Sequence, residues 1–144
     1  MNVSIRQIHP VFVGEVSAID VTRPLSHEEV AAIEAGMDRY AVLVFRDQKV
    51  TDEQQMAFSR NFGALEDARG GNITKPEDKR LQTGMNDVSN LGRDGRPLDR
   101  DSRQRLFNLG NMLWHSDSSF RAIPAKYSLL SARVVNPTGG NTEF

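Results

Sequence analysis

The alternation of apolar and polar positions predicts short strands near the start of the chain. Residues 3–21 alternate loosely between the two kinds of side chain, with Gly14 in the middle. This pattern predicts two short strands, residues 8–13 and 16–21, joined by a turn at the glycine. Residues 40–45 are apolar on both faces, which is typical of a buried strand. We therefore expect a small sheet built from these segments.

Two amphipathic helices are predicted from capping signals that precede helical periodicity. Ser26 and Glu29 have the spacing of a capping box, and apolar side chains then recur every three or four residues. These two signals predict a helix over residues 26–40. Thr51 and Gln54 repeat the capping spacing, so a second helix should begin there.

A long segment of different composition follows the second helix. Residues 64–105 are rich in Gly, Asp, Arg, Asn and Lys and show little periodicity. Loops of such length in compact domains are usually lids or binding segments. After this loop, apolar side chains in residues 107–114 bracket a predicted strand that leads into His115, and residues 127–135 form another predicted strand.

The composition excludes several classes of protein. With 144 residues, 26% of them charged, and a net charge of −1, the chain fits one globular domain better than a disordered segment or a basic nucleic-acid binder. Cysteine is absent, so a metal would have only nitrogen and oxygen ligands. The sequence has no apolar signal region and no run long enough to cross a bilayer. We expect a cytoplasmic protein without a membrane or nucleic-acid partner.

A histidine and an aspartate two positions apart form a candidate metal site. His115 and Asp117 lie in the segment Trp-His-Ser-Asp-Ser-Ser-Phe, where the chain is expected to be extended. Residues two apart on an extended chain point to the same side. An imidazole and a carboxylate can bind Fe(II) on one face of an octahedron, with a second histidine completing the triad. A histidine hydrogen-bonded to an aspartate in a polar turn, without metal, is the alternative.

Several spaced blocks of sequence accompany the His-x-Asp segment. Residues 114–120 are followed by Pro-Thr-Gly-Gly-Asn-Thr-Glu-Phe at residues 137–144. Together these blocks resemble the taurine dioxygenase family, and within it the phenoxyacetate herbicide dioxygenases. The resemblance extends to residues 42–46, 61–63 and 125–128, and so spans nearly the whole chain. It implies a non-haem iron enzyme that uses Fe(II) and takes 2-oxoglutarate as cosubstrate.

The resemblance also implies a fold and a set of ligands. The fold would be mainly β with flanking helices, a double-stranded β-helix (jelly roll). Residues 1–144 would form the N-terminal portion of that single domain, with a lid at about residues 64–105. His115 and Asp117 would bind the iron, and Thr142 would donate its hydroxyl to 2-oxoglutarate.

The expected substrate is a small anionic organic molecule, hydroxylated with O₂ while 2-oxoglutarate yields succinate and CO₂. A phenoxyalkanoate ether would break into a phenol and an oxo acid. Asn111 matches a family position that lines the substrate pocket, and Lys75 could meet a substrate carboxylate. An ordinary turn residue and a solvated lid surface are the alternatives for these two positions.

The family pattern requires a second histidine as the third iron ligand, and besides His115 this chain contains only His9 and His27. His9 and His27 are poor candidates for the third ligand, because the family takes that ligand, and its 2-oxoglutarate arginine, from far downstream. We therefore expect this chain to be part of a protein about twice as long and to be inactive alone. A metal-free jelly-roll module that binds small molecules is the alternative function. Assembly into a homo-oligomer is compatible with either.

Overall fold

The computed structural model describes residues 3–66, 80–81 and 84–144. The chain divides into two compact units, one formed by Met1–Ala64 with Leu130–Phe144 and the other by Leu65–Leu129. Among the described residues, no helix has the length and apolar character needed to span a membrane.

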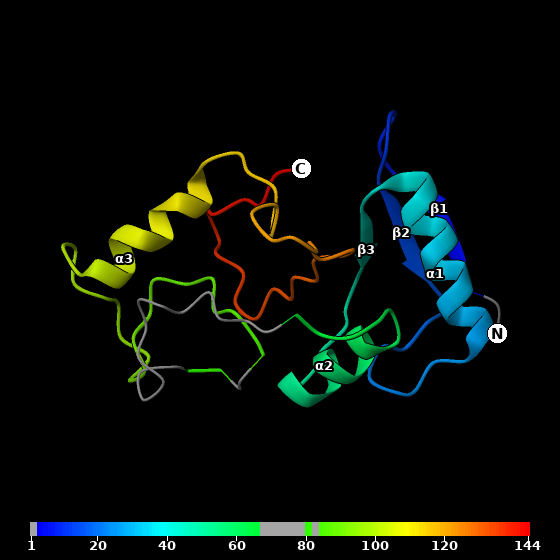
Figure 1. The fold of residues 1–144 in the computed structure, drawn as a ribbon, viewed down its shortest axis with the longest axis horizontal. Helices are drawn as coiled ribbons and strands as arrows, with labels where there is room; N and C mark the ends of the chain where they lie inside the picture. The colour runs from blue at the N-terminus through cyan, green and yellow to red at the C-terminus, as the bar shows by residue number, and fades with distance from the viewer. Residues whose placement is uncertain (1–2, 67–79, 82–83) are drawn as a thin grey trace. The chain divides into compact units, whose positions relative to one another are not determined.

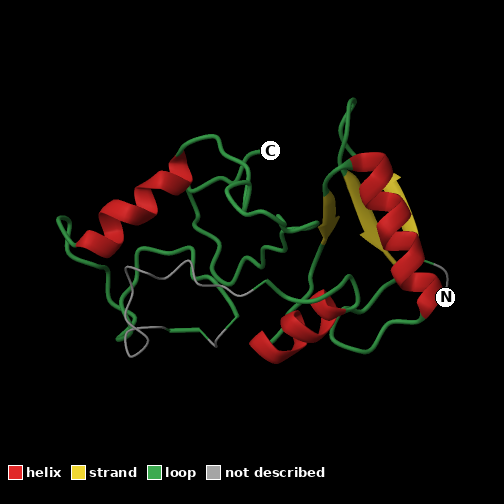
Figure 2. Ribbon diagram, in the orientation of Figure 1, coloured by secondary structure: helices red, strands yellow, loops and turns green. Residues whose placement is uncertain are grey.

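The first unit contains a small sheet covered by a helix. Its strands β1 (Ser4–Gln7), β2 (Gly14–Ser17) and β3 (Leu43–Phe45) lie in that order, with β1 antiparallel and β3 parallel to β2. The parallel pair needs a crossover connection, which helix α1 (His27–Tyr40) provides. Figures 1 and 2 show α1 lying across the sheet.

The predicted hairpin exists, but its strands and turn lie elsewhere along the chain. Residues 8–13, predicted as a strand, form the connection between β1 and β2, closed by a hydrogen bond from Ile8 N–H to the Val13 carbonyl (3.0 Å). Val13 has a φ of 75°, which breaks the extended path. Gly14, predicted as the turn, instead begins β2 and pairs with Gln7. The alternation of polarity therefore predicted a hairpin correctly and its register wrongly.

Both capping boxes are confirmed. The Ser26 hydroxyl accepts from Glu29 N–H, and the Glu29 carboxylate accepts from Ser26 N–H. Thr51 and Gln54 make the same reciprocal pair at the start of α2 (Asp52–Arg60). These contacts satisfy backbone donors that have no partner within the helix.

One apolar core joins the elements of this unit. Ile33 of α1 and Phe58 of α2 are buried together with Val21 of the loop before α1. The Phe58 ring also meets Phe45 of β3 edge-on, with ring centroids 5.7 Å apart. The predicted strand at residues 40–45 is shortened, because Tyr40 ends α1 and Ala41 turns the chain with a φ of 60°.

An arginine in the segment Leu130–Phe144 forms hydrogen bonds and an ion pair with residues at the start of α2. Arg133 donates to the Val50 carbonyl (2.6 Å) and to Oε1 of Gln55 (2.9 Å). It also forms an ion pair with Asp52 at 3.1 Å. This segment therefore belongs to the first unit although it follows the second in sequence.

The second unit contains helix α3 (Arg103–Asn108) and the 3₁₀ helix η2 (Leu109–Met112). The strand predicted at residues 107–114 is therefore wrong: the Ser102 hydroxyl caps the segment as a helix, accepting from Arg105 N–H. The strand predicted at residues 127–135 is also not observed: this segment has no backbone pairing with the described sheet, and a strand needs such a partner. The described part of the chain thus folds into a small β-sheet and a few helices.

Candidate metal centre

The side chains of His115 and Asp117 converge in the second unit. Leu113 ends η2 in an extended conformation (φ −97°, ψ 143°), and residues 114–116 continue without helix or strand until a turn begins at Asp117. The two side chains lie on the same side, with His115 Nε2 3.3 Å from Asp117 Oδ1. The predicted convergence is confirmed, although the extended segment is not a strand.

A backbone carbonyl orients the imidazole. His115 Nδ1 lies 2.7 Å from the Leu113 carbonyl oxygen. A carbonyl can only accept, so Nδ1 carries the hydrogen and Nε2 is the nitrogen that faces Asp117. Histidines that bind metals usually donate their other ring N–H to a carbonyl or carboxylate in this way, which fixes the ring and the tautomer.

The donor set and spacing suit a metal ion. Two ligands at about 2.1 Å from a metal, at right angles, are about 3 Å apart, close to the 3.3 Å observed here. The side chains are 48% and 58% exposed, so the donors are not enclosed in an apolar core. The same spacing also suits an ion pair, but an exposed pair stabilises a fold by only about 0–1 kcal/mol.

A glutamate far away in the sequence holds the turn after Asp117. Ser118 Oγ donates to Glu66 Oε2 at 2.7 Å, and Arg121 Nε lies 2.6 Å from Glu66 Oε1. Ser118 and Glu66 are 52 positions apart. Glu66 was missed by sequence reasoning, since no local spacing links a residue at the start of the long loop to the His-x-Asp segment.

The pair has no third protein ligand among the described residues, where no group of three His, Cys, Asp or Glu side chains could hold a metal. His9 is exposed in the β1–β2 connection, where its Nδ1 accepts from Val11 N–H at 3.3 Å and its ring meets Phe12. His27 is the exposed first residue of α1.

The other predicted site residues lie in different parts of the chain. Asn111 is exposed in η2, within the unit that contains the His–Asp pair. Thr142 is exposed in the segment Leu130–Phe144 of the first unit. Lys75 lies outside the described residues.

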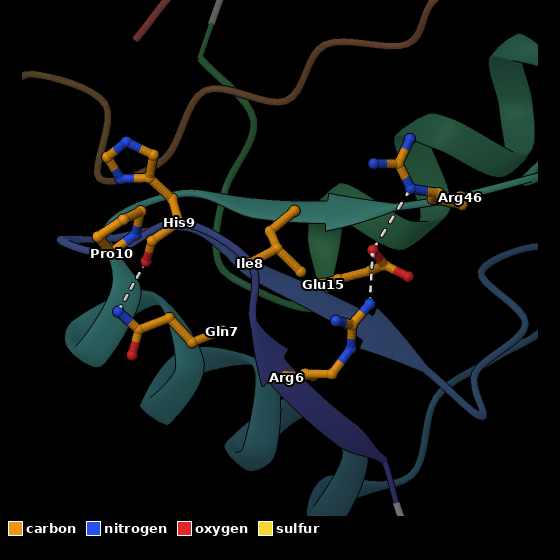
Figure 3. A pocket seen from close by; sticks show the side chains of 7 residues that line it. All are labelled: Arg6, Gln7, Ile8, His9, Pro10, Glu15 and Arg46. Atoms are coloured by element: carbon orange, nitrogen blue, oxygen red, sulfur yellow. Dashed lines mark hydrogen bonds and ion pairs between the residues drawn. The ribbon is translucent and has the colours of Figure 1, made fainter.

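An open cavity of about 720 Å³ lies in the first unit, beside the β1–β2 connection (Figure 3). Its walls include Glu15, which pairs with Arg6 at 3.5 Å and with Arg46 at 3.4 Å. No residue predicted to bind metal, cosubstrate or substrate lines this cavity. It is therefore not the candidate site.

Residues 4–144 match the family described as "Taurine catabolism dioxygenase TauD, TfdA family", so the chain belongs to this family. The match covers both units, including the His-x-Asp segment.

Individual relatives agree with the family. The chain is 44% identical, over its full length, to half of the alpha-ketoglutarate-dependent 2,4-dichlorophenoxyacetate dioxygenase of Cupriavidus pinatubonensis. It is 33% identical over 79% of its length to the (S)-phenoxypropionate/alpha-ketoglutarate-dioxygenase of Delftia acidovorans, 36% of which is covered. A crystal structure of AAD-2 in complex with Mn(II) and N-oxalylglycine matches 96% of this chain and 48% of its own, with 67% identity and a TM-score of 0.90. The chain thus spans about half the length of the protein it resembles in Cupriavidus.

Proposed function

We propose that this chain is the N-terminal part of a non-haem Fe(II)- and 2-oxoglutarate-dependent dioxygenase. The enzyme hydroxylates a small anionic organic substrate, of the phenoxyalkanoate ether type, which then separates into a phenol and an oxo acid. The observation that carries the proposal is the convergence of His115 and Asp117, 3.3 Å apart, in a member of a dioxygenase family.

Each residue of the proposed site has a defined task. His115 Nε2 and Asp117 would hold the metal, and the Leu113 carbonyl keeps that nitrogen directed toward it. Thr142 would donate its hydroxyl to the distal carboxylate of 2-oxoglutarate. Iron and 2-oxoglutarate, when bound there, would supply the oxidising chemistry, in which O₂ is consumed and succinate and CO₂ are formed. The protein contributes ligand geometry and substrate position.

The metal and cosubstrate are supported by the AAD-2 structure, which holds Mn(II) and N-oxalylglycine, an analogue of 2-oxoglutarate. The substrate class is supported by two relatives whose names specify a phenoxyacetate and a phenoxypropionate. Both relatives are named as dioxygenases, so the comparisons do not favour a metal-free binding module. Asn111 and Lys75 are the residues proposed to contact the substrate.

The fold of the whole protein is part of the proposal. We place residues 1–144 in one jelly-roll domain, with a lid at about residues 64–105, of which 67–79 and 82–83 lie outside the described residues. The second histidine of the triad and the arginine that binds 2-oxoglutarate would come from the remainder of a protein as long as its relatives. A TM-score of 0.90 to half of the AAD-2 chain supports this arrangement.

Replacing the carboxylate ligand tests the function. Asp117→Ala in the full-length protein should abolish succinate formation from 2-oxoglutarate and phenol release from a phenoxyalkanoate, because one of three protein ligands is lost. Asp101→Ala is the matched control, since Asp101 is an exposed aspartate of the same unit outside the site. Succinate is measured by chromatography. Turnover of Asp117→Ala near the wild-type rate would refute the proposal.

A further inference from the structure

Both carboxylate oxygens of Glu66 contact the segment that follows the proposed metal ligand Asp117. One oxygen accepts from Ser118 Oγ at 2.7 Å, and the other lies 2.6 Å from Arg121 Nε. The Glu66 and Arg121 side chains are each 30% exposed, so this contact is more sheltered than the His115–Asp117 pair. The contact from Ser118 Oγ is a hydrogen bond to a charged acceptor, which is stronger than a neutral one, and the contact with Arg121 is an ion pair.

The two contacts hold both ends of one turn. A hydrogen bond from Arg121 N–H to the Ser118 carbonyl (3.0 Å) closes a turn over residues 118–121, directly after Asp117, so that Ser118 and Arg121 are its two ends. Ser118, directly after Asp117, has a φ of 55°, a left-handed conformation that is uncommon for residues other than glycine and needs support from its surroundings. Its hydroxyl contact with Glu66 is one such constraint. The backbone direction at Asp117 is thereby tied to Glu66.

We propose that Glu66 is a positioning residue for the metal ligand Asp117. This rests on the proposed function. The Leu113 carbonyl orients His115 locally, whereas Asp117 is 58% exposed and begins a turn, so its direction depends on how that turn is held. Both oxygens of Glu66 are engaged by Ser118 and Arg121, so Glu66 orients the ligand and does not bind the metal itself.

The test measures metal affinity directly in the full-length protein. Glu66→Ala removes both contacts, while Glu66→Gln keeps an oxygen for Ser118 and loses the charge that pairs with Arg121. Because residues that orient metal ligands typically change affinity by about 10–100-fold, Glu66→Ala should weaken Mn(II) binding by about that factor. Glu66→Gln should fall between it and the wild type. Mn(II) dissociation constants are measured by calorimetry or by electron paramagnetic resonance of free Mn(II).

The matched control is Glu15→Ala. Glu15 also pairs with arginines, Arg6 and Arg46, and its side chain is 26% exposed, but it belongs to the other unit. Its removal should leave the Mn(II) dissociation constant unchanged. Thermal unfolding of each variant separates a loss of fold from a loss of ligand position.

The outcomes distinguish the two proposals. Unchanged Mn(II) affinity in folded Glu66→Ala, with normal binding by the wild type, would overturn the positioning role and leave the proposed function intact. Failure of the wild type to bind Mn(II) would overturn both. If Glu66→Ala does not fold, Ser118→Ala removes the hydroxyl contact alone and should still weaken Mn(II) binding. Unchanged Mn(II) affinity in both Ser118→Ala and Glu66→Gln would then overturn the positioning role of Glu66.

Discussion

At the scale of single residues, the start of α1 shows how charge and hydrogen bonds act together. The Arg23 guanidinium donates to the Glu29 carboxylate, and Ser26 N–H donates to it at 2.8 Å. These contacts, with Arg23 the larger cause, lower the pKa of Glu29 from 4.5 to about 2, against the opposing effect of burial. The side chain that completes the capping box is therefore also an ion-pair partner.

This lowered pKa predicts a dependence of stability on pH. A carboxylate with a depressed folded pKa contributes stability that is fully present above its unfolded value and is lost as pH falls through the folded value. The contribution of Glu29 should thus be complete above about pH 4.5 and decline toward pH 2. Urea unfolding of the full-length protein and of Glu29→Gln should show a wild-type advantage at pH 6 that shrinks at pH 3. An advantage that stays constant over this range would contradict the assignment.

At the scale of elements, the contact between α1 and the sheet depends on glycine. A Cβ atom built on Gly14 would lie 2.6 Å from Ile5, 2.8 Å from Tyr40 and 2.9 Å from Leu43. These atoms come from β1, the end of α1 and β3. The absence of a side chain at Gly14 therefore allows three elements to approach one another.

Gly14→Ala should accordingly destabilise the protein. An added methyl group in a filled space forces neighbours to move, which typically costs about 1–3 kcal/mol. Gly110→Ala is the control, because a Cβ atom built there would point into open space, with no contact within 4 Å beyond its own helix backbone and chain neighbours. The free energy of unfolding, measured with urea, should fall for the first variant and change little for the second. Equal losses of unfolding free energy in the two variants would show that the close packing around Gly14 does not contribute to stability as proposed.

At the scale of the whole molecule, the second unit exposes large apolar side chains in the part of the sequence that contains the candidate metal ligands. Trp114 is 76% exposed, Phe120 85% and Ile123 87%. Concentrations of such side chains usually mark a surface that another part of a protein covers. Because the chain spans half of its Cupriavidus relative, we expect the remainder of a protein of that length to pack on this surface.

A dye that binds exposed apolar surface tests this expectation. The 144-residue chain expressed alone should enhance the fluorescence of 8-anilinonaphthalene-1-sulfonate strongly, whereas the full-length protein should not, since its apolar side chains are covered. Equal enhancement per mole of the two proteins would mean that these side chains remain exposed in the complete molecule.

The sequence by itself determined the features that depend on near neighbours. The capping boxes at Ser26 and Thr51 join residues three apart, and both helices begin where those signals predict. The two-residue spacing of His115 and Asp117 on an extended chain was enough to predict their convergence. Such contacts form within one turn or one extended step, so local spacing encodes them.

Only the tertiary structure decided the features that join distant segments. The same alternation suits a strand or a connection, and the packing of Ile5 and Leu43 around Gly14 decided that this glycine lies in a strand. Residues 127–135 have strand-like composition but pair with none of the described strands, and a strand requires a partner for its backbone hydrogen bonds. Glu66 reaches Ser118 across 52 positions. No local spacing specifies such a contact, because it exists only once the chain has folded.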